Sequence, residues 1–327
     1  MIDVVCPDCR CTIVQSGTDS FCCRGCGKEY PVIKGILSFI APDSKVSFGD
    51  YEEKQISAWT HSAALRKKMR RNRFLEALNT ARIHLSLSGR RDRFFLSQIP
   101  KDRSRIMLDL GCGGGRYYFA DRAIVVGADP VFELLMEAGE LYDEVYHCNA
   151  LSLPFADNTF DYVVSSDFIG HISFEDKDQL FAEMFRVLKK GGRSIHLSEA
   201  MASNCWFRFA RKYPDLFQKY FIDRPGHIGM EPASDLRTRF LKHGFKEVAF
   251  QQTTSTLQEC GFYTSCFDNE YKHHSTALRG LVNLDRVLSK FVIVKEAINV
   301  VFEPLSRIDN AFSPIDYGSA ILAAFEK

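Results

Sequence analysis

Short apolar runs alternate with amphipathic stretches through the central part of this 327-residue chain. Between residues 105 and 252 the apolar runs are rich in β-branched residues, and segments with helical spacing separate them. This alternation is typical of a parallel sheet whose strands are joined by crossover helices. With one more apolar run near the C-terminus, it predicts strands at Arg105–Leu110, Ala123–Ala128, Val145–Cys148, Tyr162–Ser165, Arg193–Leu197, Lys246–Gln251 and Ser319–Glu326.

The segments between these strands predict helices. Lys177–Leu188 and Ala233–His243 place apolar residues at helical spacing. Leu188–Gly192 has two lysines followed by two glycines, the composition of a helix C-terminus. Together the elements predict a doubly wound α/β domain over residues 105–327, with a helical insertion at about residues 254–316.

The insertion contains a long amphipathic segment, Leu281–Ile308. A segment of this kind usually covers a core, and it can instead form a lid over an apolar or lipid-linked molecule. Both interpretations remain open from the sequence. The apolar stripe consists of Leu281, Leu284, Leu288, Phe291, Ile298, Val301, Leu305 and Ile308.

Residues 43–104 form a basic region with a helical pattern. Thirteen lysines and arginines lie between His61 and Arg105, against three acidic residues, although the formal charge of the whole chain is only +1. The pattern predicts an amphipathic basic helix that acts as a linker or cap. Its basic face, within residues 61–105, either contacts RNA phosphates or an anionic membrane surface, or is a solvated face of a helix packed on the domain.

Composition limits the class of protein. Hydrophobic residues make up 46% of the chain and 27 residues are Phe, which favours a packed core over disorder. The N-terminus lacks the pattern of a secretory signal, and no apolar run approaches the roughly 20 residues that span a bilayer. We therefore expect a cytoplasmic protein without a transmembrane segment, able to bind a membrane at most peripherally.

Cysteines concentrate at the N-terminus, where six of the eleven fall within the first 26 residues. They include two CxxC pairs, Cys6 with Cys9 and Cys23 with Cys26, which can supply four thiolates to one tetrahedral zinc ion. Cys22 offers an alternative to Cys23 in a shifted register, and the sequence leaves this choice open. With the following Tyr30–Ile36, residues 1–42 resemble the short zinc ribbons found with many methyltransferases.

The most informative motif in the central region is Ile106–Arg116, an apolar strand that continues into a glycine-rich turn expected to open a helix. Glycines let the backbone approach a ligand closely, and a helix start offers free N–H groups. The spacing differs from a dinucleotide fingerprint, because Arg116 stands where that pattern requires its third glycine. Asp109, just before the first glycine, favours a ligand with an amino group.

Three further elements follow at the ends of predicted strands. Asp129 can accept hydrogen bonds from both hydroxyls of a ribose. Asn149 can bond the edge of an adenine, and Leu151 can pack on its face. Ser166 lies where the fourth strand reaches the same edge.

Residues 105–200 resemble the class I S-adenosylmethionine-dependent methyltransferases of the small-molecule branch. The resemblance implies a Rossmann-like sheet with strand order 3-2-1-4-5-7-6, the last strand being antiparallel. Asn149 departs from the aspartate usual at its position. The cofactor site implied by the four elements consists of Asp109, Gly111, Cys112, Gly113, Asp129, Pro130, Asn149, Ala150, Leu151 and Ser166.

Two histidines are candidate catalytic residues, because methyl transfer requires removal of a proton from the acceptor. His171 follows the fourth predicted strand, and His227 lies in the loop before the helix at Ala233–His243. Imidazole titrates near neutral pH and suits this task. Each histidine can instead have a structural role in which it bonds the backbone, and of the two His227 is the stronger candidate for the catalytic role.

Three functions remain compatible with the sequence. The first is methyl transfer to a small-molecule, glycan or lipid-linked acceptor, which the helical insertion favours. The second is methylation of ribosomal or transfer RNA, which the basic region favours. The third is a non-catalytic binding or activator protein with a methyltransferase fold.

Overall fold

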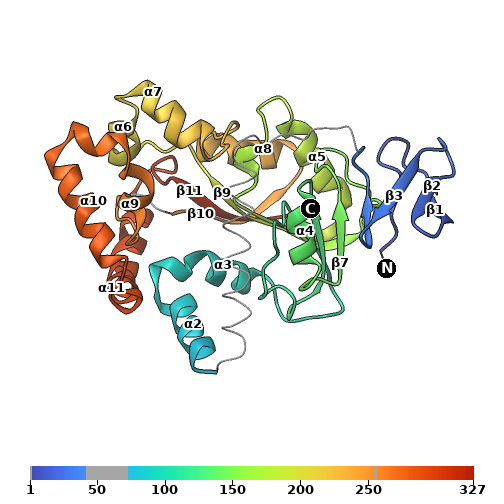
Figure 1. The fold of residues 1–327 in the computed structure, drawn as a ribbon, viewed down its shortest axis with the longest axis horizontal. Helices are drawn as coiled ribbons and strands as arrows, with labels where there is room; N and C mark the ends of the chain where they lie inside the picture. Colours follow the sequence, from blue (N-terminus) through green and yellow to red (C-terminus); the bar gives the residue numbers. More distant parts are fainter. Residues whose placement is uncertain (1, 42–72, 254–255) are drawn as a thin grey trace.

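The computed structural model describes residues 2–41, 73–253 and 256–327, and Figure 1 shows how its elements are arranged. Within these residues the strands form one sheet with the order β1-β2-β3-β4-β7-β6-β5-β8-β9-β11-β10. In chain order the strands are β1 (Ile13–Gly17), β2 (Ser20–Cys23), β3 (Glu29–Ile33), β4 (Ile36–Ser38), β5 (Ile106–Leu110), β6 (Ile124–Asp129), β7 (Glu144–His147), β8 (Phe160–Ser166), β9 (Leu188–Glu199), β10 (Lys246–Thr253) and β11 (Ala320–Glu326).

Parallel strands form the centre of the sheet, in the order β7, β6, β5, β8 and β9. Strands such as β5 and β8 are buried on both faces, which explains why they occur in the sequence as continuous apolar runs. β11 pairs antiparallel with β9, and β10 pairs antiparallel with β11. From β7 to β10 this order is 3-2-1-4-5-7-6, as expected for a Rossmann-like methyltransferase sheet.

The predicted number of seven strands was too small, because over the described residues the sheet has eleven. The difference comes from the N-terminal segment, which was expected to be a separate ribbon. Its strand β4 pairs in parallel with β7, with Leu37 opposite Tyr146 and Ser38 opposite His147. The four strands β1–β4 therefore continue the methyltransferase sheet beyond β7.

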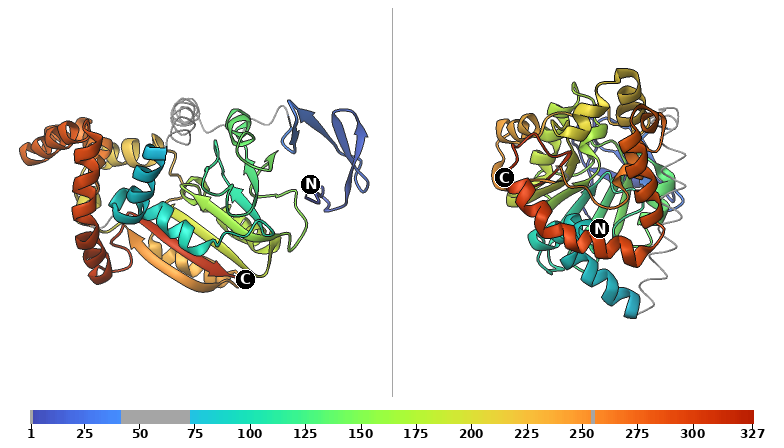
Figure 2. Two further views of the ribbon diagram at one scale, coloured as in Figure 1. Left: turned by 90° about the horizontal axis from the view of Figure 1, so that it is seen from below. Right: turned by 90° about the vertical axis from the view of Figure 1, so that its left-hand side faces the viewer.

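Helices cover both faces of the sheet, as the two views in Figure 2 show. α5 and α8 pack with residues of the N-terminal segment into one core, and α3 and α4 contribute to a second core on the opposite face. The helices are α2 (Arg73–Leu85), α3 (Arg90–Gln98), α4 (Phe132–Ala138), α5 (Lys177–Val187), α6 (Cys205–Ala210), α7 (Pro214–Phe217), α8 (Ala233–Lys242), α9 (Phe262–Phe267), α10 (Thr276–Leu288) and α11 (Val292–Phe312).

Two local expectations were wrong. Residues 111–122, which begin with the glycine-rich turn, form successive turns and no helix. Leu188–Gly192 is not a helix C-terminus, because α5 ends at Val187 and Leu188 already pairs with Phe160 as part of β9. Gly191 has φ +75° at the irregularity in this pairing, and its N–H donates to the carbonyl of Lys327. Gly191 therefore permits an irregularity in the strand and does not end a helix.

A helical cap forms from two insertions that are distant in the sequence. The predicted insertion supplies α9, α10 and α11, and residues 205–223, which were not predicted as an insertion, supply α6, α7 and a π-helical turn, η3 (Gln218–Asp223). The two insertions lie side by side (Figure 1) and share an aromatic core of their own. Its buried aromatic residues are Phe207, Phe217, Phe221, Phe267 and Tyr271.

The long amphipathic segment is broken into α10 and α11, and most of its apolar stripe is exposed. The interpretation that the stripe covers a core is therefore wrong. In α11 the buried positions Asn299, Glu303 and Ser306 are polar, whereas the side chains of Ile293 and Phe312 are 86% and 88% exposed. The exposed members of the predicted stripe are Leu281, Leu284, Phe291, Val301, Leu305 and Ile308.

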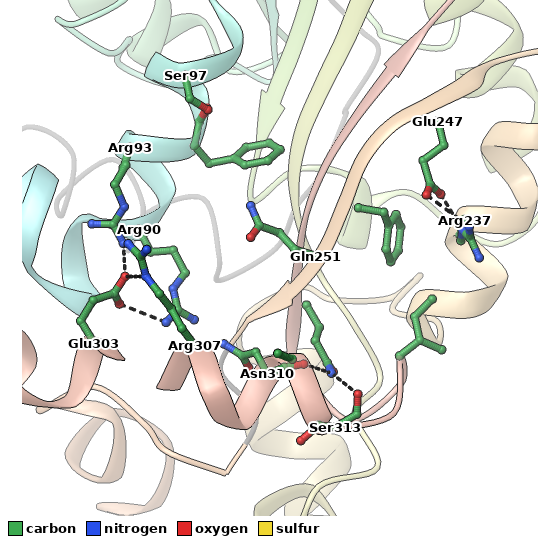
Figure 3. Close-up of a pocket in the computed structure, with 15 residues that line it drawn as sticks. Arg90, Arg93, Ser97, Arg237, Glu247, Gln251, Glu303, Arg307, Asn310 and Ser313 are labelled. Atoms are coloured by element: carbon green, nitrogen blue, oxygen red, sulfur yellow. Dashed lines mark hydrogen bonds and ion pairs between the residues drawn. The ribbon is translucent and has the colours of Figure 1, made fainter. Parts of the chain in front are cut away.

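Glu303 anchors α11 to α3, as Figure 3 shows. Its carboxylate, 6% exposed, lies 3.0 Å from Arg90, pairs with Arg93, and accepts from Arg307 Nε at 2.8 Å. These residues line a cavity of about 740 Å³ between α3, β10 and α11. The basic residues Arg90 and Arg93 of the predicted basic region are thus bound to a carboxylate of the same chain.

Residues 61–72 of the predicted basic helix lie outside the described residues, as do residues 43–60 of the same predicted linker. α2 and α3 occupy the remainder of that region. Among the helices of the described segments, none is long and apolar enough to cross a membrane.

We expect Glu303→Gln to lower the free energy of unfolding by about 3 kcal/mol, because buried guanidinium groups lose their charged partner. Chemical denaturation of the full chain measures this effect. Glu247→Gln is the control, because Glu247 pairs with the partly exposed Arg237 and its loss should cost less than about 1 kcal/mol. Equal effects of the two changes would contradict the anchoring role of Glu303.

Candidate functional site

The glycine-rich turn after β5 lies at the carboxyl end of the parallel strands. The backbone N–H groups of Gly111 and Cys112 both donate to the carbonyl of Ala128, at 2.9 and 3.2 Å, which ties the turn to the end of β6. Gly111 has φ +65°, and a Cβ at this position would lie 2.3 Å from the ring of Phe168. Only glycine fits here. Cys112, fully enclosed beside Gly127, packs in this turn, and burial raises the pKa of its thiol well above the ordinary value.

Asp129 connects two turns of this edge. One carboxylate oxygen accepts from the N–H of Gly113 at 2.9 Å, and the other accepts from the N–H of Val131 at 2.8 Å. The carboxylate is buried at the end of β6, and the N–H of Cys148 donates to the Asp129 carbonyl at 3.3 Å. The structure therefore brings the ends of β5, β6 and β7 together around Asp129.

Asp109 is enclosed at the end of β5, with 1% of the residue exposed. Burial raises its pKa to about 6, although the positive charge of Arg116 and the hydrogen bond from the Tyr142 hydroxyl, 2.6 Å away, act in the opposite direction. Tyr142 also accepts from the N–H of Arg116 at 2.6 Å. Tyr142 and Arg116, neither predicted from the sequence, thus fix the surroundings of Asp109.

The remaining predicted cofactor residues lie around the same edge. Asn149 is exposed and its side-chain oxygen accepts from the N–H of Leu151 at 2.9 Å. Ala150 is buried, and the carbonyl of Pro130 lies 3.0 Å from Nε2 of His147. Ser166, at the end of β8, donates to Asp167 at 2.9 Å. Asp167 has φ +58°, a conformation that a non-glycine residue adopts rarely and that occurs at functional sites.

His171 and His227 come together although 56 positions separate them in the sequence. Their ring centroids are 5.1 Å apart. His171 lies in η2 (Ile169–His171) after β8, and His227 follows η3 of the cap. Glu199, the last residue of β9, joins them, with Oε1 3.5 Å from Nε2 of His227.

This cluster of His171, Glu199 and His227 carries shifted pKa values. Burial alone would raise the pKa of Glu199, but the interaction with His227, whose Nε2 lies 3.5 Å from Oε1, outweighs it and holds the pKa below its ordinary value. For His227, burial acts to lower the pKa, and Glu199 more than offsets it, so that the pKa is raised. For His171, burial dominates and lowers the pKa. Two neighbouring histidines therefore have opposite tendencies to carry charge.

Glu199 was missed in the sequence, although the signal was present. It lies two residues beyond the predicted strand Arg193–Leu197. A carboxylate just after a parallel strand is the feature that identified Asp129, and the same criterion applied to this strand would have found Glu199. Its pairing with His227 depends on the cap and could not be predicted from spacing.

The four cysteines predicted as metal ligands lie together at the N-terminus. Their sulfur atoms are all within 4.8 Å of one another. Sγ of Cys6 lies 3.7 Å from that of Cys26, and Sγ of Cys9 lies 3.3 Å from that of Cys23. Cys22 points instead to the backbone carbonyls of Cys23 and Gly27. The geometry therefore selects Cys23 over Cys22 for this cluster.

Residues 108–196 match the family described as methyltransferase domain. Over 160 residues the chain is 31% identical to a protein of Encephalitozoon cuniculi (strain GB-M1) that is named as a methyltransferase, and the match covers 44% of this chain and 75% of that protein. The chain therefore belongs to the family of class I S-adenosylmethionine-dependent methyltransferases.

Other relatives differ in their named acceptors. A demethylmenaquinone methyltransferase of Lactiplantibacillus plantarum is 28% identical over 184 residues, which are 48% of this chain and 77% of that protein. A tRNA (carboxymethyluridine(34)-5-O)-methyltransferase of Xenopus tropicalis is 32% identical over 103 residues, which are 31% of this chain. The match spans only 16% of the length of this tRNA methyltransferase.

Solved structures that are similar to this chain include phosphoethanolamine N-methyltransferase 2 of Haemonchus contortus in complex with S-adenosyl-L-methionine. It is 20% identical with a TM-score of 0.44, and the match covers 73% of this chain and 53% of that one. A S-adenosylmethionine-dependent methyltransferase from Archaeoglobus fulgidus is 19% identical with a TM-score of 0.44, and the match covers 77% and 99% of the two chains.

Asp109→Asn measures what the buried carboxylate costs the fold. The pKa of Asp109 lies at about 6 in the folded chain and at 3.8 ordinarily, so the folded state binds more protons between these values and stability falls as the pH rises through them. The neutral amide should raise the free energy of unfolding by up to about 3 kcal/mol at about pH 7.5. Urea denaturation should show this gain disappearing below about pH 4, and a gain that is the same at both pH values would contradict it.

Proposed function

We propose that this protein transfers the methyl group of S-adenosylmethionine to a small-molecule, glycan or lipid-linked acceptor. The observation that carries the proposal is the junction at Asp129, where a strand-end carboxylate and a glycine-rich turn meet on the carboxyl edge of a parallel sheet. Ligands of open α/β sheets bind at this edge. Membership of the methyltransferase family agrees with it.

The cofactor would bind along the carboxyl edge of the sheet, and a different residue would contact each of its parts. Asp109 would meet the ammonium of the methionine moiety, and its ionised form would attract that charge. Asp129, at the carboxyl end of β6, would accept hydrogen bonds from the ribose hydroxyls. Asn149 is exposed with its amide NH₂ facing away from the Leu151 bond, which leaves it able to contact adenine.

The acceptor would bind on the other side of β5, toward β8, β9 and the cap. His171 and His227 are there together with Glu199, at the ends of the strands that follow the cofactor elements in the sheet. Both histidines remain the proposed catalytic residues. An imidazole in this position can take a proton from the acceptor or hold a metal ion that activates it.

Ion pairing within the chain favours this function over RNA methylation. Among the described basic residues of the region 61–105, Arg90 and Arg93 bind Glu303, and Arg91 pairs with Asp92 and lies 3.4 Å from Asp167. Guanidinium groups already held by carboxylates are poor sites for nucleic-acid phosphates. The outward apolar side of α10 and α11 accords with an apolar or lipid-linked acceptor.

The N-terminal cysteine cluster fits a structural zinc ion. Four thiolates at these separations provide a closed tetrahedral set, and a segment with four short strands has little core of its own. Cys6, Cys9, Cys23 and Cys26 would hold the ion, which would fix β4 beside β7. Reduced thiolates of this kind agree with the cytoplasmic location expected from the sequence.

Calorimetric titration of the full chain with S-adenosylmethionine, and then with S-adenosylhomocysteine, tests the proposed activity. We expect saturable binding, weakened at least about tenfold by Asp129→Asn, because the loss of one charge-assisted acceptor costs about 1.5–3 kcal/mol. Asp19→Asn is the control, because it makes the same replacement of a carboxylate by an amide at an exposed position of the N-terminal segment; it should leave the affinity unchanged. A folded protein that binds neither ligand would leave only the non-catalytic interpretation.

Zinc content per chain tests the cysteine cluster. Cys23→Ser should lose the ion, measured by elemental analysis, because Cys23 faces the other three sulfurs. Cys22→Ser should retain one zinc per chain, because this side chain points to backbone carbonyls outside the cluster. The reverse result would move the ligand assignment to the shifted register.

A further inference from the structure

The cluster of His171, Glu199 and His227 has the composition of a metal-binding site. One ligand atom from each residue lies within 4.8 Å of the other two. The three residues come from the end of β9, from η2 after β8, and from the cap loop after η3, so the fold brings them together from separate elements. Two imidazoles and one carboxylate are a common ligand set for divalent first-row transition metals.

Glu199 has an oxygen with no assigned partner. Its Oε2 is fully enclosed and has no hydrogen-bond partner among the residues that the structure describes. Leaving a carboxylate oxygen buried in this way costs free energy unless a donor or a cation compensates it. A Cβ on Gly170 would lie 3.0 Å from Oε2, so the glycine keeps space open beside this oxygen.

The distance between Nε2 of His227 and Oε1 of Glu199 is typical of two ligands of one metal ion. At 3.5 Å, Nε2 and Oε1 are farther apart than the roughly 2.7–2.9 Å of a closed charge-assisted hydrogen bond. Two atoms that each lie about 2.1 Å from one ion at a tetrahedral angle are about 3.4 Å apart. The pair therefore has the spacing that an ion between them would require.

A backbone carbonyl orients the imidazole of His171. Nδ1 of His171 lies 3.0 Å from the carbonyl oxygen of Gly226. A histidine that donates one ring N–H to a carbonyl keeps the lone pair on its other nitrogen for a metal. This second hydrogen bond accompanies most metal-ligating histidines in proteins.

We propose that His171, Glu199 and His227 bind a divalent transition-metal ion, and that the ion binds a hydroxyl oxygen of the methyl acceptor. The second part rests on the proposed methyltransferase function. Three protein ligands leave coordination positions open, as in catalytic metal sites. The bound hydroxyl releases its proton to water, its oxygen forms a bond to the methyl carbon, and the carbon–sulfur bonding pair remains on sulfur as S-adenosylhomocysteine leaves.

Mn²⁺ is the probe that separates this site from the cysteine cluster, because it prefers nitrogen and oxygen ligands over thiolates. Titration of the full, zinc-containing chain with Mn²⁺, followed by electron paramagnetic resonance, should show one bound ion per chain. Glu199→Gln and His171→Ala should each weaken this binding more than about tenfold. His84→Ala, which removes an exposed histidine elsewhere, should leave it unchanged.

Parallel calorimetry with S-adenosylmethionine shows whether each variant is folded and distinguishes the two proposals. If the wild-type chain binds the cofactor but not Mn²⁺, or if both cluster variants bind Mn²⁺ as the wild type does, the metal site is refuted and the methyltransferase function stands. If the chain binds Mn²⁺ at the cluster but not the cofactor, the metal site stands and its role in methyl transfer is refuted.

Discussion

The parallel pairing of β5 with β6 and β8 is the constraint on which the rest of the site depends. In this register Asp109 lies opposite Gly127 and Val164, so that every functional strand end reaches the same edge. The Asp129 carboxylate then fixes the turns after β5 and β6 by two backbone hydrogen bonds. The residues proposed to bind the cofactor and the acceptor are neighbours because the strands that carry them are neighbours.

Much of this arrangement could be predicted from the sequence, because strands buried on both faces have continuous apolar runs. The predicted strands overlap β5–β11, and the end of each run located Asp109, Asp129 and Asn149. What depends on tertiary contacts was missed: β4 has three residues and pairs with β7 only in the folded chain. The break between α10 and α11 falls at Ser289–Phe291. The proline of this segment, Pro304, lies inside α11, so the usual helix-breaking residue does not indicate where the break occurs. Glu199 meets His227 only through the cap.

The cap shows how an unusual helix can remain docked. α11 buries Asn299, Glu303 and Ser306 and turns much of its apolar surface outward, which is the reverse of an ordinary amphipathic helix. The hydrophobic effect therefore contributes less to its docking than directed polar contacts do. Glu303 with its arginines fixes the helix against α3, and the side chain of Asn299 accepts from the N–H of Cys260 at 2.9 Å. The position of the cap, and with it His227, depends in part on electrostatics.

The pairing of β4 with β7 has a consequence for the way the chain avoids self-association. A parallel sheet that ended at β7 would present a row of unsatisfied N–H and C=O groups, which is a template for recruiting strands of other molecules. In this protein the N-terminal hairpins occupy that border and leave β1, whose residues from Gln15 to Gly17 are exposed and polar or small, as the outermost strand. The small N-terminal segment thus covers the β7 edge of a much larger domain, so that the backbone groups of β7 pair within the chain and not with another molecule.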